Sequence, residues 1–138
     1  MKHLKRKIFF ILLLAFQLNC KGQQLEKKNK ISLDGTWEII FDENNKGVQE
    51  KWYLIENFGN QKTKKITVPS CWEEFEKNYE GAGIYQTKFT IPKNWDDKII
   101  QLNFEAVNYK SEVWINDQVV GFHEGGYTPF SFRVDKLI

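Results

Sequence analysis

The sequence predicts an all-β fold made of two packed antiparallel sheets. From Ile31 onward, apolar and polar residues alternate with a period of two. The apolar positions are rich in β-branched and aromatic residues, and Gly, Pro, Asn or Asp interrupts them about every eight to twelve positions. Because each such strand has one apolar face to bury, two sheets packed face to face are the simplest arrangement.

The first half of this region predicts three strands. Residues 36–42 follow the turn signal Asp34-Gly35, with Trp37, Ile39 and Phe41 on the buried face and Asp42 on the outer face. A short strand over 66–68 ends at Pro69, and a longer one covers 85–91 before Pro92. Between these two, residues 73–79 predict a single short helical turn.

The second half predicts four more strands. A turn over 94–97 precedes a strand over 100–106, and the last strand covers 130–134. Between them, residues 113–115 and 119–122 flank Asn116-Asp117, a pair that tolerates the positive φ of a tight turn and so predicts a hairpin. The pattern then stops at Ile138 without a polar closing segment, so we expect a sandwich cut short before its last strand.

The first thirty residues predict a leader followed by a tether. A positively charged start precedes nine uncharged apolar residues, 8–16, which are too few to span a bilayer, so residues 1–19 are interpreted as a signal peptide. Cys20 then resembles the lipid-modified first residue of a mature bacterial lipoprotein, with 20–30 as a polar tether. The alternative is ordinary cleavage after Gly22. Either interpretation predicts export, and lipidation predicts a periplasmic or outer-membrane lipoprotein.

Charge and cysteine content exclude several classes of function. Without the four basic residues that precede Cys20, sixteen basic residues face eighteen acidic ones, so we expect no nucleic-acid partner. Cys71 has no disulfide partner and is expected to be a small buried residue. With His123 the one histidine beyond the leader, the sequence predicts neither a metal nor another cofactor.

Catalysis within this chain is not predicted. Glu73 and Glu74 are adjacent and diverge on any regular element. Glu105 and Glu124 could meet only through a fold that the sequence does not specify, and carboxylates on strand faces are usually solvated. His123-Glu124 resembles a base with an orienting carboxylate, but no nucleophile stands in a recognisable motif. A structural role for His123 is therefore favoured.

Seven short motifs follow one another in a fixed order along the chain. They are Leu33-Asp34-Gly35-Thr36-Trp37, Val68-Pro69-Ser70-Cys71-Trp72, Gly81-Ala82-Gly83-Ile84-Tyr85, Phe89-Thr90-Ile91-Pro92, Phe104-Glu105-Ala106-Val107, Val113-Trp114-Ile115-Asn116 and the run GFHEGGYTPF at 121–130. Together, over about residues 31–138, they resemble the amino-terminal sugar-binding domain of glycoside hydrolase family 2. The β-glucuronidases are the most similar members, followed by the β-galactosidases.

This resemblance implies a fold, a partner and a site. The fold is a jelly-roll β-sandwich similar to galactose-binding domains, and the partner is a carbohydrate, a β-glycoside. By the same resemblance, the catalytic barrel and its two glutamates belong to later domains of a longer exported retaining β-glycosidase, and no residue of this chain inherits a catalytic role. The loop after the 66–68 strand faces that barrel in the family, which makes Trp72, Glu73, Asn78 and Tyr79 the candidate sugar-binding residues. One departure is Asn116-Asp117, where many members have Asn-Gly.

Two alternatives remain open. One is a stand-alone surface lipoprotein that binds carbohydrate without hydrolysing it. The other is an assembly module whose open sheet edge takes up a strand of another chain.

Overall fold

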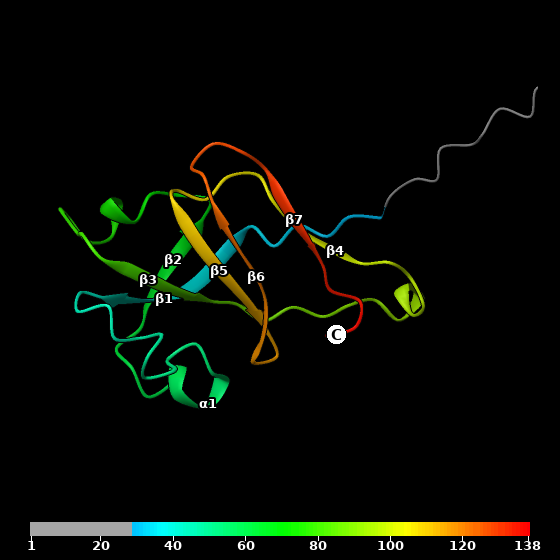
Figure 1. The fold of residues 1–138 in the computed structure, drawn as a ribbon, viewed down its shortest axis with the longest axis horizontal. Coiled ribbons are helices and arrows are strands. Elements are labelled where there is room, and N and C mark those ends of the chain that lie inside the picture. Colours follow the sequence, from blue (N-terminus) through cyan, green and yellow to red (C-terminus); the bar gives the residue numbers. More distant parts are fainter. Residues whose placement is uncertain (1–28) are drawn as a thin grey trace, which may run out of the picture. The chain divides into compact units, whose positions relative to one another are not determined.

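A computed structural model describes residues 29–138, and every element of its fold lies within the unit Ser32–Ile138 (Figure 1). The predictions on the leader, the tether up to Lys28 and Cys20 lie outside the described residues. Among the residues described, none belongs to a helix long and apolar enough to cross a membrane. The strands are β1 (Gly35–Asp42), β2 (Lys64–Val68), β3 (Ala82–Gln86), β4 (Gln101–Phe104), β5 (Lys110–Ile115), β6 (Gln118–Glu124) and β7 (Phe130–Arg133).

The strands pair in three antiparallel sheets. A three-stranded sheet has the order β2-β1-β3, and two-stranded sheets pair β4 with β7 and β5 with β6. Figure 1 draws the β5–β6 hairpin across the three-stranded sheet and the β4–β7 pair to its right. The predicted all-β antiparallel fold is therefore confirmed, with the pairing divided among three small sheets.

The central strand β1 is buried more thoroughly than its alternation indicates. Ile39 and Ile40 are adjacent and point to opposite faces, yet both are buried. Asp42, expected on the outer face, is only 2% exposed. Its two carboxylate oxygens accept hydrogen bonds from the backbone N–H groups of Lys46 at 3.0 Å and Gly47 at 2.7 Å. The outer-face prediction for Asp42 is wrong because the following turn folds back over the carboxylate.

The predicted strand over 85–91 is shifted in the structure. β3 begins earlier, at Ala82, and ends at Gln86, where its register with β1 ends at the pair Glu38–Gln86. Residues 87–91 belong to no strand, and Phe89 is exposed. The alternation in this segment is strand-like, but a strand also needs a ladder partner for its backbone groups, and β1 stops providing one here.

The predicted hairpin is confirmed as β5 and β6. Asn116 and Asp117 have φ angles of 48° and 64°, as a two-residue turn of the type I′ class requires. A bulge between Val113 and Trp114 shifts the register. Trp114 is partly buried and stacks on Tyr53 with ring centroids 4.4 Å apart.

Three short helical turns lie in the connections. η1 (Trp72–Glu74) overlaps the start of the short turn predicted over 73–79 and begins one residue before it. η2 (Lys93–Trp95) overlaps the start of the turn predicted over 94–97. The four-residue helix α1 (Ile55–Phe58) was not predicted. Its Phe58 is one of the most deeply buried side chains of the described residues, so this connection contributes directly to the core.

Candidate functional site

Two of the four sugar-binding candidates are packing residues in this structure. Tyr79 is 8% exposed, and its hydroxyl donates to the carbonyl oxygen of Ala82 at 2.6 Å. Its ring meets Phe41 edge-on at 4.8 Å and Trp72 edge-on at 5.6 Å. Burial, followed by the nearby Asp42 carboxylate, raises the pKa of Tyr79. The Trp72–Tyr79 pair therefore fixes the shape of the loop from within.

The other two candidates, Glu73 and Asn78, are exposed. Asn78 has a φ of 57°, a left-handed conformation that Asn adopts more readily than most residues. It lies on a shallow hollow of about 320 Å³. The other lining residues are Glu43, Glu76, Lys77, Tyr79 and Glu80. Because three of these six side chains are acidic, the hollow favours hydroxyl donors over anions.

Glu73 lies near Tyr85 rather than with Asn78 in that hollow. Burial is the main cause that raises the pKa of Tyr85, and the charges of Glu73 and Cys71 raise it further. Cys71 itself is exposed, so the prediction of a small buried cysteine is wrong. It stands between the end of β2 and η1. The four candidates are thus brought to one loop, but they divide between an inner aromatic pair and two separate surface positions.

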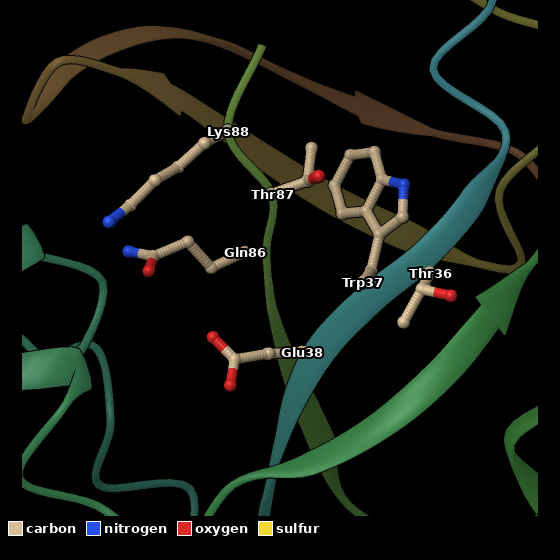
Figure 2. A pocket seen from close by; sticks show the side chains of 6 residues that line it. All are labelled: Thr36, Trp37, Glu38, Gln86, Thr87 and Lys88. Atoms are coloured by element: carbon tan, nitrogen blue, oxygen red, sulfur yellow. The ribbon is translucent and has the colours of Figure 1, made fainter.

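A second hollow, of about 240 Å³, lies where β1 and β3 separate (Figure 2). It is lined by Thr36, Trp37, Glu38, Gln86, Thr87 and Lys88. The last ladder pair is Glu38–Gln86, so continuation of the antiparallel register would pair Trp37 with Thr87 and Thr36 with Lys88. These are the residues that line the hollow. It is therefore an opening in the β1–β3 ladder rather than a cavity enclosed by loops.

The two sides of this opening differ in chemistry. Figure 2 shows Glu38, Gln86 and Lys88 reaching toward one side, while the Trp37 ring lies beside Thr87. The indole N–H of Trp37 donates to the carbonyl oxygen of Leu33 at 2.8 Å, which holds the ring in place. The opening thus offers a carboxylate, an amide and an ammonium group for hydrogen bonds. Alternation alone could not reveal this group, because the sequence predicted a strand that continues past Gln86.

The described residues do not assemble the parts of a catalytic site. Glu124 forms an ion pair with Lys110 at 3.2 Å, and a hydrogen bond from Tyr109, followed by one from Lys110, lowers the pKa of Glu124. His123 stacks on Phe130 with ring centroids 4.0 Å apart, and its Nε2 lies 3.2 Å from the Thr128 hydroxyl. These contacts support the structural role expected for His123. No group of three or more metal-ligating side chains occurs between residues 29 and 138.

Comparison with known proteins relates the chain to sugar-cleaving enzymes. Residues 73–138 match the sugar binding domain of glycosyl hydrolases family 2. A β-galactosidase of Priestia megaterium is 28% identical over 163 residues, which covers 98% of this chain and 16% of that protein. A β-glucuronidase of Rattus norvegicus is 28% identical over 117 residues, which covers 77% of this chain and 18% of that protein.

The fold is shared with a solved enzyme. The crystal structure of the β-glucuronidase from Ruminococcus gnavus superposes with a TM-score of 0.71 at 29% identity, covering 78% of this chain and 19% of the enzyme. The chain thus spans less than a fifth of the length of each of these three relatives. These matches, together with the antiparallel β fold, identify residues 73–138 as part of the sugar binding domain of glycosyl hydrolases family 2.

Proposed function

We propose that this chain is the non-catalytic, sugar-binding part of an exported β-glycosidase that acts on β-glucuronides or β-galactosides with retention of configuration. The observation that carries the proposal is the family match over residues 73–138, joined to relatives that are named β-galactosidase and β-glucuronidase. The arrangement of the described side chains is consistent with a non-catalytic role, because the acidic residues weighed for catalysis are either exposed or engaged in ion pairs.

The loop after β2 supplies the proposed sugar contacts. The proposed site remains Trp72, Glu73, Asn78 and Tyr79. Their roles differ according to how deeply each side chain is buried. Glu73 and Asn78 are exposed and can accept or donate hydrogen bonds to sugar hydroxyls. Trp72 and Tyr79 pack against each other and hold the loop in shape. A β-glycoside bound here would be oriented by Glu73 and Asn78, and the packing of Trp72 against Tyr79 would hold the backbone of their loop in place.

Export is the second part of the proposal. The basic start and the apolar run over 8–16 would direct the chain out of the cytoplasm, and acylation at Cys20 would anchor it to a membrane. A single acyl-bearing cysteine and a polar tether would leave the sugar-binding domain free above the lipid surface. Mass spectrometry of the mature protein distinguishes a diacylglyceryl-modified Cys20 from ordinary cleavage after Gly22.

The test of the proposal compares two proteins in the same assay. The 138-residue chain and the product of the native locus, translated through whatever codons follow Ile138, are each incubated with 4-nitrophenyl β-glucuronide and 4-nitrophenyl β-galactoside. We expect turnover from the native product and none from the 138-residue chain. Turnover by the short chain would contradict the non-catalytic assignment. A native product that ends at Ile138 and hydrolyses neither glycoside would instead favour a stand-alone carbohydrate-binding protein.

A further inference from the structure

One face of the β5–β6 hairpin carries an exposed aromatic ring among charged side chains. The register pairs Lys110 with Glu124 and Glu112 with Phe122. Because side chains alternate across a strand and directly paired residues share a face, these four lie together. We call Lys110, Glu112, Phe122 and Glu124 the hairpin face. All four are exposed, and Phe122 is 80% exposed.

The opposite side of the hairpin is already used for packing. His123 stacks on Phe130, and Gly121 is packed so closely that an added Cβ would lie 2.5 Å from the Phe132 ring. The intervening residue Phe122 therefore cannot turn inward, since its strand neighbours occupy that side. The strand register sets the side to which Phe122 points, so its exposure does not depend on the conformation of a flexible loop.

Two of the three charged groups around Phe122 are paired with each other. Glu124 is bound by Lys110 at 3.2 Å and accepts a hydrogen bond from the Tyr109 side chain, and these contacts lower its pKa. Glu124 is therefore ionised at neutral pH. Glu112, directly across from Phe122, takes part in none of the ion pairs found in the described part of the chain. One ammonium group and two carboxylates give the hairpin face a net negative charge.

We propose that the hairpin face is a stacking platform for a neutral pyranoside, such as a β-galactoside, and this inference rests on the proposed function in carbohydrate binding. The apolar C–H face of the sugar lies on the Phe122 ring, and sugar hydroxyls donate to the carboxylates of Glu112 and Glu124. Hydrogen bonds to an ionised acceptor are shorter and stronger than those between neutral groups. The ring and the two acceptors thus match the two chemical sides of a pyranose.

The surroundings of Phe122 favour a sugar over a protein partner. Protein interfaces bury roughly 800 Å² on each side, and their centres are depleted of charged residues. Here a single ring is bordered by Glu112 and Glu124, so the apolar area is too small and too charged for such a centre. A monosaccharide needs only one ring and a few hydrogen-bonding groups beside it.

The charge of the hairpin face also predicts a preference between the two sugars. A glucuronide brings its own carboxylate close to the unpaired Glu112, and like charges repel. At a separation of about 4 Å in water this repulsion amounts to roughly a five-fold difference in affinity, and it diminishes with added salt. The face should therefore bind the neutral glycoside more tightly than the uronide.

The test is a titration of the 138-residue chain, labelled with ¹⁵N, with methyl β-galactopyranoside and with the methyl β-glycoside of glucuronic acid. We expect the amide resonances of Glu112 and Phe122 to shift with the galactoside at millimolar concentration. Phe122→Ala should weaken this binding at least ten-fold, whereas Phe122→Trp should retain it. Glu112→Gln should reduce the five-fold discrimination against the uronide. Because Phe122 is exposed, an unchanged melting temperature shows that each variant is folded.

The outcomes separate this inference from the proposed function. Shifts confined to residues such as Glu73 and Asn78, with Phe122→Ala binding as the parent chain does, overturn the hairpin platform and leave sugar binding at the loop after β2 intact. The absence of any shift with either sugar overturns the platform as well. In either case the hydrolysis comparison of the native product and the short chain still decides the proposed function independently.

Discussion

The carboxylate of Asp117 accepts a hydrogen bond from the backbone N–H of Ile55 at 3.0 Å, across 62 positions of the sequence. Ile55 is the first residue of α1, and the N-cap residue Leu54 provides no side-chain cap of its own. The hairpin turn therefore caps a helix in a distant connection. The same turn also binds near the end of the described chain, since the Asn116 side-chain amide donates to the carbonyl oxygen of Leu137 at 2.7 Å.

This contact gives a physical reason for Asp117 where many relatives are expected to have glycine. Glycine would adopt the φ of 64° without strain, but it would leave the N–H of Ile55 without this acceptor. We expect Asp117→Ala to lower the free energy of unfolding by about 2 kcal/mol, from the lost cap and from a Cβ in a left-handed conformation. Urea denaturation measures the change.

Asp117→Asn is the matched control for this prediction. Asparagine keeps an oxygen acceptor and tolerates positive φ, so its free energy of unfolding should stay close to that of the parent chain. Amide exchange at Ile55 should accelerate in Asp117→Ala and not in Asp117→Asn. Equal exchange rates in the two variants would show that the contact does not cap α1 in solution.

The buried carboxylate of Asp42 predicts a second stability effect. Its oxygens accept from the N–H groups of Lys46 and Gly47, both in the turn after β1. Asp42→Ala leaves two backbone donors without these acceptors, which should cost about 3 kcal/mol in the free energy of unfolding. The neighbouring exposed Glu43→Ala should change it by less than about 0.5 kcal/mol. Equal effects of the two substitutions in thermal unfolding would contradict the buried role of Asp42.

Trp37, which lines the opening in Figure 2, tests whether the inner face of β1 is assigned to the right residues. The ring is partly buried and its N–H is bound to the carbonyl oxygen of Leu33, so Trp37→Ala should cost about 3 kcal/mol, the lower end for a large-to-small change. Trp37→Phe keeps most of the packing and should cost less. A melting temperature that Trp37→Ala leaves unchanged would mean that the inner face of β1 is assigned to the wrong residues.

Local patterns predicted the strands that have a ladder partner, including the distant pair β4 and β7, and failed where the expected strand has none. The hairpin at Asn116-Asp117 was predicted because its turn chemistry and its two strands lie within fifteen residues. The strand over 85–91 was wrong beyond Gln86, since alternation reports side-chain faces and says nothing about whether another backbone runs alongside. Helix α1 has a weak local signal, and its cap comes from Asp117 in another part of the chain.

The candidate site shows the same limit. Sequence motifs brought attention to the loop containing Trp72 and Tyr79, and the structure does bring these two rings together. Which ring would be buried could not be predicted, because burial of Tyr79 depends on Phe41 in β1 and on the carbonyl oxygen of Ala82. The exposure of Phe122 could not be predicted either, since alternation in β6 does not say which side of the hairpin packs on β7.

The neighbourhood of Glu73 and Tyr85 supplies a prediction in solution that needs no ligand. Burial raises the pKa of Tyr85 above its ordinary value, and the Glu73 carboxylate adds to this by opposing a second negative charge nearby. Glu73→Gln should therefore lower the pKa of Tyr85 while leaving it above the ordinary value, because burial is the larger cause. Titration of ring-labelled tyrosine by NMR follows Tyr85 separately from the other tyrosines.

The sign of the linked stability change follows from the direction of this shift. A folded-state pKa above the unfolded value gives stability that is fully present below the unfolded pKa of about 10 and is lost as the pH rises through the folded pKa. Because Glu73→Gln brings the folded-state pKa closer to the unfolded value, less stability is lost on ionisation, and alkaline unfolding should occur at a slightly higher pH than in the parent chain. Glu74→Gln, one residue away and not among the causes of the shift, is the control and should titrate as the parent does. If both substitutions moved the Tyr85 titration equally, the effect would come from net charge and Glu73 would not lie beside the phenol.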